Sequence, residues 1–96
     1  MLLELSGDLD LAVKEQLRQQ LDAASLGSSE VAVDLSKVDY ADSTALGLLV
    51  GTRNRLRERG GRLILVAPST HMLKLLEYAG LASTFDTVDN YIASSS

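Results

Sequence analysis

The stretch VAVDLSKVDYADSTALGLLVG, from Val31 to Gly51, decides the fold. Its aliphatic beginning predicts a short buried strand over residues 30–35. After a loop, apolar or small residues recur at the spacing of one helical face, at Ala45, Leu48, Leu49, Thr52 and Leu56. Asp42 stands just before this helix, where its carboxylate can accept the free backbone N–H groups of the first turn. The stretch therefore predicts a helix over residues 43–59 with Ser43 at the positive end of its dipole.

Strands and helices also alternate on the N-terminal side of this stretch. Leucines that alternate with polar residues predict a first strand over residues 3–6, which we expect to end at a Gly7-Asp8 turn. An amphipathic helix then follows Asp10 and ends near Gly27, since glycine is common at helix C-termini. We expect its inward face to be formed by Val13, Leu17, Leu21 and Ala24.

On the C-terminal side, the continuous apolar run over residues 63–66 is typical of a strand that is covered on both faces. Pro68-Ser69 opens a third helix, and Gly80 ends it, with Leu81 folding back on Leu76. The inward face of this helix is expected to hold Met72, Leu73 and Leu76. A short segment and a last helix with Val88, Tyr91 and Ile92 complete the chain.

The alternation of strands and helices indicates an α/β fold with right-handed crossovers. We expect one domain over residues 1–96, with a mostly parallel four-stranded sheet and about four helices. The loops that follow parallel strands emerge at the carboxyl edge of the sheet, where such folds bind ligands and partners. This geometry predicts that four carboxylates lie close to Ser43, those of Asp8, Asp10, Asp39 and Asp42.

Composition excludes several classes of function. Thirteen acidic and nine basic residues give a net charge of −4, which opposes binding to nucleic acid or anionic lipid. We expect the clustered arginines to complement the negative end of the helix dipole and to solvate its outer face, with contact to a partner or a lipid headgroup as the alternative; they are Arg53, Arg55, Arg57, Arg59 and Arg62. With no cysteine and a single histidine, we expect neither a metal nor another cofactor. The longest uncharged apolar run, Ala45 to Gly51, is much shorter than the roughly 20 residues that span a bilayer, so a cytoplasmic location without membrane insertion is expected.

Several of these segments together resemble a known family. The core Asp42-Ser43-Thr44-Ala45-Leu46-Gly47, between a strand that ends in Asp34-Leu35 and an apolar helix, is similar to the STAS domain of bacterial anti-sigma factor antagonists. Residues 6–10 resemble the Gly-Glu-Leu-Asp turn of that family, residues 61–66 its next strand, and residues 76–81 the end of its third helix. The resemblance covers nearly the whole chain.

The chain departs from the family at its beginning. STAS antagonists usually have an additional strand before the Gly-Glu-Leu-Asp region, whereas here only Met1 to Ser6 precede that turn. We therefore expect the extra N-terminal strand to be missing. A sheet edge or an apolar patch would then be available for self-association, for example as a homodimer.

The resemblance implies a binding protein that is not itself an enzyme. Unphosphorylated, it would capture an anti-sigma factor that is also an ATP-dependent serine kinase, and so release the sigma factor. Phosphorylation of Ser43 would end this binding, and a phosphatase would restore it. Thr44 is a rival phosphate acceptor. The residues that match the motif around the contact surface of the family are Asp10, Asp42, Ser43, Thr44, Ala45, Leu46 and Gly47.

Three other interpretations of the same residues stay open. Ser43 can simply be a solvated residue of the helix cap. Similar STAS domains also serve as accessory subunits of membrane transporters for lipids or anions. More remotely, residues 41–45 imitate the Gly-x-Ser-x-Gly elbow of serine hydrolases, with His71 on the same edge. Only Glu58 could supply an acid between Ser43 and His71, however, and the chain order differs from that of such hydrolases.

Overall fold

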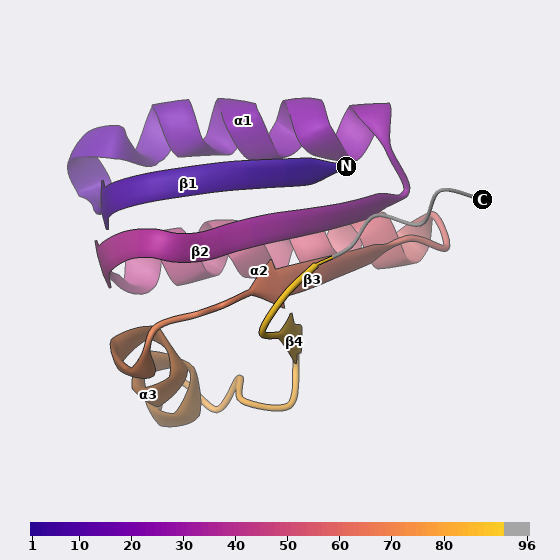
Figure 1. Ribbon diagram of the computed structural model, residues 1–96. Helices are drawn as coiled ribbons and strands as arrows, with labels where there is room; N and C mark the ends of the chain where they lie inside the picture. The colour runs from indigo at the N-terminus through magenta and orange to yellow at the C-terminus, as the bar shows by residue number, and fades with distance from the viewer. Residues whose placement is uncertain (92–96) are drawn as a thin grey trace.

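A computed structural model describes residues 1–91 of the chain (Figure 1). Its elements are β1 (Leu2–Leu9), a 3-10 turn (Leu11–Val13), α1 (Lys14–Gly27), β2 (Glu30–Ala41), α2 (Ser43–Glu58), β3 (Arg62–Val66), α3 (Thr70–Tyr78) and β4 (Asp86–Val88). The strands form one sheet in the order β1-β2-β3-β4, and each neighbouring pair is parallel. This confirms the predicted α/β architecture with its four-stranded parallel sheet.

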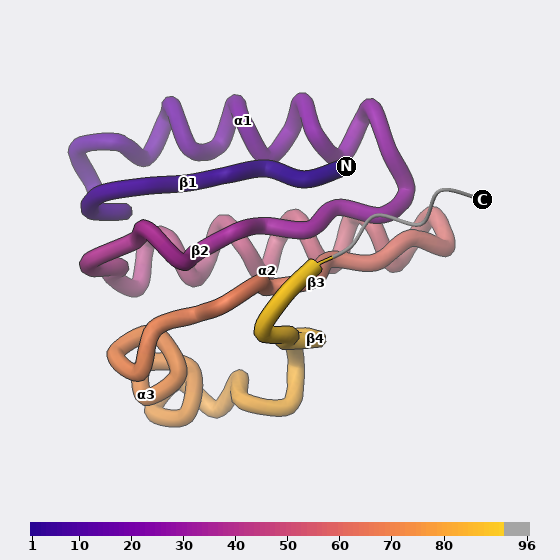
Figure 2. The backbone as a smooth tube through the Cα atoms, in the orientation of Figure 1, coloured from indigo at the N-terminus to yellow at the C-terminus, as the bar shows by residue number. Residues whose placement is uncertain are grey.

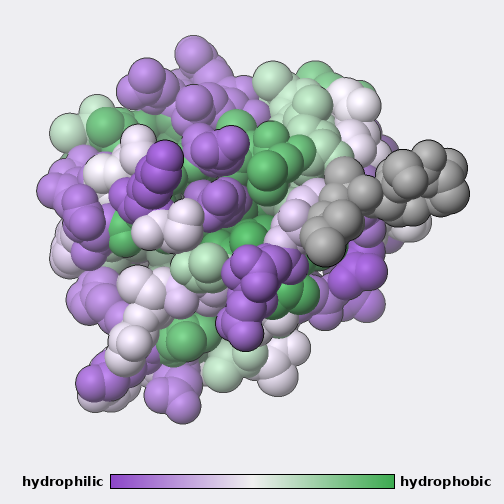
Figure 3. Space-filling model, in the orientation of Figure 1, coloured by the Kyte–Doolittle hydropathy of each residue, from purple (hydrophilic) through white to green (hydrophobic). Residues whose placement is uncertain are grey.

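Helices α1 and α2 lie on one face of the sheet, where they enclose the main hydrophobic core. Alternate residues of β2 point to this face, among them Val31, Val33 and Leu35, and meet buried leucines of both helices. On the opposite face a smaller cluster joins Ala32, Ile64 and Val66 to Val88 and Tyr91. Figure 3 shows that this second face mixes apolar and polar side chains. Most of the apolar packing of the sheet therefore lies on the face that the helices cover.

The first two strands are longer than the sequence predicts. The predicted turn at Gly7-Asp8 is wrong, because β1 continues through it to Leu9, and β2 likewise continues to Ala41. The pairing between the two strands shifts register twice, between Glu4 and Ser6 and between Gly7 and Asp8. Gly7 has φ of 77°, a conformation that suits glycine at a bulge. The residues that suggested a turn are thus absorbed as irregularities within a parallel ladder.

The C-terminal part also differs from prediction at two positions. Val88 belongs to β4, where it pairs with Val66, so it is not part of a fourth α-helix, and Ile92 lies outside the described residues. In α3, Met72 and Leu76 are buried as expected, but Leu73 is 43% exposed. The end of this helix is confirmed: Gly80 has φ of 74°, and the Leu81 N–H donates to the Leu76 carbonyl at 2.7 Å.

Candidate functional site

The carboxyl ends of β1 and β2 meet at one edge of the molecule, next to the start of α2 (Figure 2). Leu9 and Ala41 are partners in the sheet, and the Asp42 N–H donates to the Leu9 carbonyl at 3.1 Å. Asp10 and Asp42 therefore follow directly from two bonded strand ends. Asp8 precedes Leu9 in β1 and is the sheet partner of Tyr40. As predicted, acidic residues of both strands share this edge with Ser43.

Asp42 fixes the start of α2. Its Oδ1 accepts hydrogen bonds from the N–H groups of Thr44 at 2.9 Å and Ala45 at 3.2 Å, and its carbonyl accepts one from Leu46 at 3.2 Å. The predicted N-cap is confirmed. Ser43 is consequently the first residue of the helix, and its side chain is exposed, whereas that of Thr44 is half-buried.

The other predicted contact residues differ in what they offer to a partner. Gly47 is exposed one turn along α2 from Ser43, but Ala45 and Leu46 are only 1% and 5% exposed and belong to the core. Asp10 is half-buried, and its carboxylate accepts the Ala12 N–H at 3.0 Å, which caps the 3-10 turn. The buried Ala45 and Leu46 thus anchor the start of α2 in the core, and the side chain of Ser43 is exposed on its surface.

Two neighbouring residues at this edge were not among the predicted contacts. The rings of Tyr40 and His71 stack with their centroids 5.6 Å apart and their planes at 28°. Tyr40 is 46% exposed at the end of β2, and His71 is exposed near the start of α3. The sequence could have singled out Tyr40, because it is an aromatic residue between Asp39 and the helix cap Asp42. The stack gives the edge an apolar contact area beside Ser43.

The same stack bears on the hydrolase interpretation. Within residues 1–91, the contact found for the His71 ring is with Tyr40, and no hydrogen bond joins it to Ser43. A nucleophilic serine needs a base within hydrogen-bond reach that is oriented by a third group. That arrangement is not assembled here.

The arginine-rich end of α2 lies at the other end of the helix from Ser43. Arg55 pairs with Asp22 of α1 at 2.8 Å, and Arg59 donates to the Ser25 carbonyl. Arg62, at the start of β3, pairs with Asp86 at 3.1 Å. The 16 residues of α2 span roughly 24 Å at 1.5 Å each, so these guanidinium groups serve contacts far from the Ser43 end.

The described residues also bear on metals and membranes. In residues 1–91, no three His, Cys, Asp or Glu side chains come together as a set of metal ligands. None of the helices found in that range has both the length and the apolar character needed to cross a membrane.

Comparison with known proteins agrees with this arrangement. The family model described as "Mlab, STAS domain" matches residues 1–88. The chain is 30% identical over 82 residues to the anti-sigma-B factor antagonist of Bacillus subtilis, covering 85% of this chain and 75% of that protein. Among solved structures, the anti-sigma factor antagonist SpoIIAA in its unphosphorylated form superimposes with a TM-score of 0.73 at 25% identity, over 94% of this chain and 79% of that one. The Bacillus cell fate determinant SpoIIAA in its phosphorylated form gives 0.71 at 26%, over 93% and 82%. With this family match and these relatives, the chain belongs to the STAS domain family.

Proposed function

We propose that this protein is an anti-sigma factor antagonist, and that phosphorylation of Ser43 by the anti-sigma factor itself, acting as a serine kinase, controls its binding. The observation that carries the proposal is the position of Ser43: an exposed hydroxyl at the first residue of a capped helix, on the sheet edge that is open to a partner. Relatives named as anti-sigma factor antagonists support the general function, and one of them is known in both unphosphorylated and phosphorylated forms.

The helix start can carry a phosphate without unfolding. A phosphoryl group at the N-terminus of a helix is favoured by the dipole and by backbone N–H groups. Asp42 already satisfies the N–H groups of Thr44 and Ala45, so the cap stays in place when Ser43 is modified. Ser43 is also the better acceptor of the two hydroxyl residues, because Thr44 is half-buried. The modified protein should therefore keep its fold.

The switch would act on binding. A phosphate adds about −1.5 to −2 charges at neutral pH to an edge that already carries Asp42, Asp39 and Asp8. A partner that covers this edge would have to desolvate the new charge, and Arg55 and Arg59 make their contacts at the other end of α2. A penalty of about 3 to 5 kcal/mol, comparable with a stranded buried charge, weakens a complex by roughly 10² to 10⁴. A phosphatase that removes the phosphate would restore binding.

The first experiment is phosphorylation by candidate anti-sigma kinases with ATP, followed by intact-mass measurement. We expect one added phosphate, which disappears in Ser43→Ala and persists in the matched control Thr44→Val. Ser43→Asp should keep the circular dichroism spectrum of the parent protein and lose kinase capture by about 10². Equal capture of the parent protein and of Ser43→Asp would contradict the electrostatic mechanism.

The same experiment separates the transporter interpretation. If no candidate kinase modifies Ser43, and the protein instead copurifies with a transporter ATPase whose activity Ser43→Ala still supports, then the accessory-subunit function is correct. In that case the edge around Ser43 would be a constitutive docking surface. Measuring both Ser43→Ala and Ser43→Asp in each assay keeps the two outcomes distinct.

A further inference from the structure

One cavity of the described structure, of about 340 Å³, is lined by three members of the arginine cluster. They are Arg53 and Arg57 of α2 and Arg62 at the start of β3. Arg53 and Arg57 stand at i and i+4, so their side chains are neighbours on one face of the helix. We call this hollow the arginine cavity. Its volume lies within the range of about 300 to 1,000 Å³ that is typical of pockets for small molecules.

Two of these guanidinium groups have no acidic partner within residues 1–91. Arg62 pairs with Asp86 at 3.1 Å. No ion pair of Arg53 or Arg57 is found in the described range. Arg53 is nevertheless half-buried, and its Nη1 donates to the side-chain oxygen of Asn54 at 3.1 Å, which is a neutral acceptor. Partial burial of a charge without an opposite charge is unfavourable, so the cavity is suited to an anion that supplies one.

The loop before β4 adds hydroxyl groups to the arginine cavity. Ser83 and Thr84 both line it. The Thr84 N–H donates to the Leu81 carbonyl at 3.0 Å, and Thr84 is half-buried, so this part of the wall is held by the fold. A hydroxyl group can donate to a phosphate oxygen. Among the described residues that line the cavity, none is aromatic, so a nucleobase would have no ring on which to stack.

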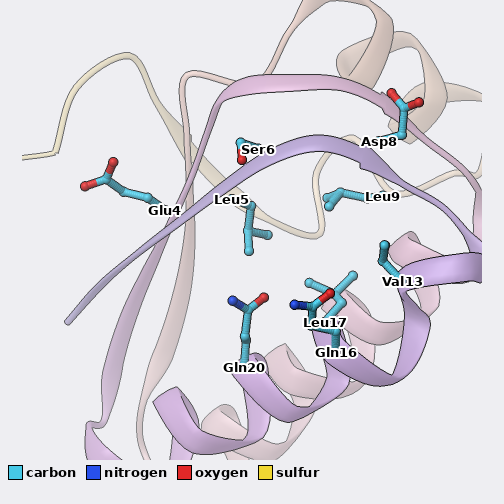
Figure 4. Close-up of a pocket in the computed structure, with 9 residues that line it drawn as sticks. All are labelled: Glu4, Leu5, Ser6, Asp8, Leu9, Val13, Gln16, Leu17 and Gln20. Atoms are coloured by element: carbon cyan, nitrogen blue, oxygen red, sulfur yellow. The ribbon is translucent and has the colours of Figure 1, made fainter.

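The cavity between β1 and α1 has the opposite charge (Figure 4). Its volume is about 180 Å³, and of the 9 residues drawn there none is basic, whereas Glu4 and Asp8 are acidic. An anion would meet two carboxylates there and no guanidinium group. In the arginine cavity the one acidic residue of the described lining, Asp86, is already paired with Arg62. Of these two cavities, charge therefore favours the arginine cavity for an anionic ligand.

We propose that the arginine cavity binds the phosphate group of a small polar molecule such as a sugar phosphate. The planar guanidinium groups of Arg53 and Arg57 donate pairs of N–H groups to the phosphate oxygens, a geometry that arginine favours. A phosphate monoester carries about −1.5 to −2 charges at neutral pH, which matches the two guanidinium groups without an acidic partner. The hydroxyl groups of Ser83 and Thr84 donate to the remaining oxygens of the ligand. Ser43 takes no part in this binding.

Isothermal titration calorimetry with ribose 5-phosphate, in a chloride buffer of low ionic strength, is the first test. Ribose is the matched control, since it lacks only the phosphate group. We expect ribose 5-phosphate to bind at least about tenfold more tightly than ribose. Absence of binding by ribose 5-phosphate, or equal binding of the two ligands, would overturn the proposal.

Variants of the protein locate the binding. Arg53→Gln and Arg57→Gln should each weaken binding of ribose 5-phosphate about tenfold, because each removes a charged pair of donors. Arg57 is exposed, so its variant tests the proposal even if Arg53→Gln fails to fold. Lys74→Gln removes one positive charge from the exposed surface of α3 and should change the affinity by less than about twofold. Equal losses for Arg57→Gln and Lys74→Gln would mean that only the net charge acts, and would contradict the proposal.

NMR spectra of the arginine Nε–H groups give a readout on the unmodified protein. On addition of ribose 5-phosphate, the resonances of Arg53 and Arg57 should shift more than that of Arg18, which is paired with Glu15 on α1. Equal shifts of all three would contradict binding in the arginine cavity.

A last measurement identifies the source of the phosphate. Cosedimentation with phosphatidylcholine vesicles that contain phosphatidic acid tests a lipid headgroup as the ligand, and we expect no more protein in the pellet than with phosphatidylcholine alone. Binding to the phosphatidic acid vesicles without binding to ribose 5-phosphate would overturn the assignment to a small molecule. Ser43→Ala should bind ribose 5-phosphate like the parent protein, which keeps this test separate from that of the proposed function.

Discussion

The position of Ser43 depends on the cap provided by Asp42, and replacing this residue tests that dependence. Asp42→Ala removes two hydrogen bonds, to the N–H groups of Thr44 at 2.9 Å and Ala45 at 3.2 Å. Loss of an N-cap costs about 0.5 to 2 kcal/mol, and because this site is half-buried with two donors left unpaired we expect about 1.5 kcal/mol. In a domain of this size, such a loss lowers Tm by about 6 to 12 °C.

Thermal unfolding followed by circular dichroism at 222 nm measures this loss directly. The matched control is Asp42→Asn, which keeps a side-chain oxygen at the acceptor position and should cost less than about 0.5 kcal/mol. The proposed phosphorylation of Ser43 should slow in the alanine variant, because the frayed first turn no longer holds the hydroxyl in one place. A change in Tm below about 2 °C for Asp42→Ala, or equal losses for alanine and asparagine, would refute the argument that the cap positions Ser43.

Three further predictions concern stability. At Gly61, an added Cβ would lie 2.1 Å from the Ser29 carbonyl oxygen, so Gly61→Ala should lower the free energy of unfolding by about 3 kcal/mol or prevent folding. Gly60 has open space around it but φ of 76°, so Gly60→Ala should lower it by only about 1 kcal/mol. Urea unfolding measures both losses. The backbone N–H of Ser36 donates to Asp34 and holds the pKa of that carboxyl below its usual value. The ionised carboxylate of Asp34 therefore stabilises the folded protein above its unfolded-state pKa, and this stabilisation is lost as the pH falls through the folded-state pKa. Asp34→Asn should flatten the acid limb of a curve of unfolding free energy against pH, and an unchanged limb would contradict this. The Tyr91 hydroxyl donates a hydrogen bond to the carboxylate of Glu30 at 2.7 Å, which raises the pKa of Tyr91 above its ordinary 10.0. The stability that this bond contributes is complete below pH 10 and is lost as the pH rises through the folded-state pKa. A Tyr91→Phe variant that loses as much stability at alkaline pH as the parent protein would contradict this.

The sequence predicted those parts of the fold in which local signals agree with the tertiary structure. The apolar spacing of α2 is set within one helix, and the capping carboxylate of Asp42 and the glycine at position 80 each act over a single turn. All three were located correctly. Placement of the acidic residues beside Ser43 needed only the rule that parallel strands end at one edge. These features could be predicted because neighbouring residues determine them.

The misplaced parts are those that distant contacts determine. Gly7 and Asp8 have the composition of a turn, but pairing with β2 holds them in a strand with a bulge. Val88 could belong to a helix by its spacing, and it is the parallel partner Val66 that makes it part of β4. The exposed stack of Tyr40 on His71 likewise joins residues from two separate elements. No window of sequence contains both members of such pairs, so these features appear only in the folded molecule.

The all-parallel pairing of the described strands has a consequence for how the chain reaches its native state. Leu2 pairs with Ala32, and Glu30 with Arg62, so each of these ladders closes a loop of about thirty residues. No hairpin among these strands can form early and serve as a template, since each neighbouring pair needs a crossover. Folding of this domain should therefore be slow for its size, and a ribosome must synthesise β2 before β1 can pair with it.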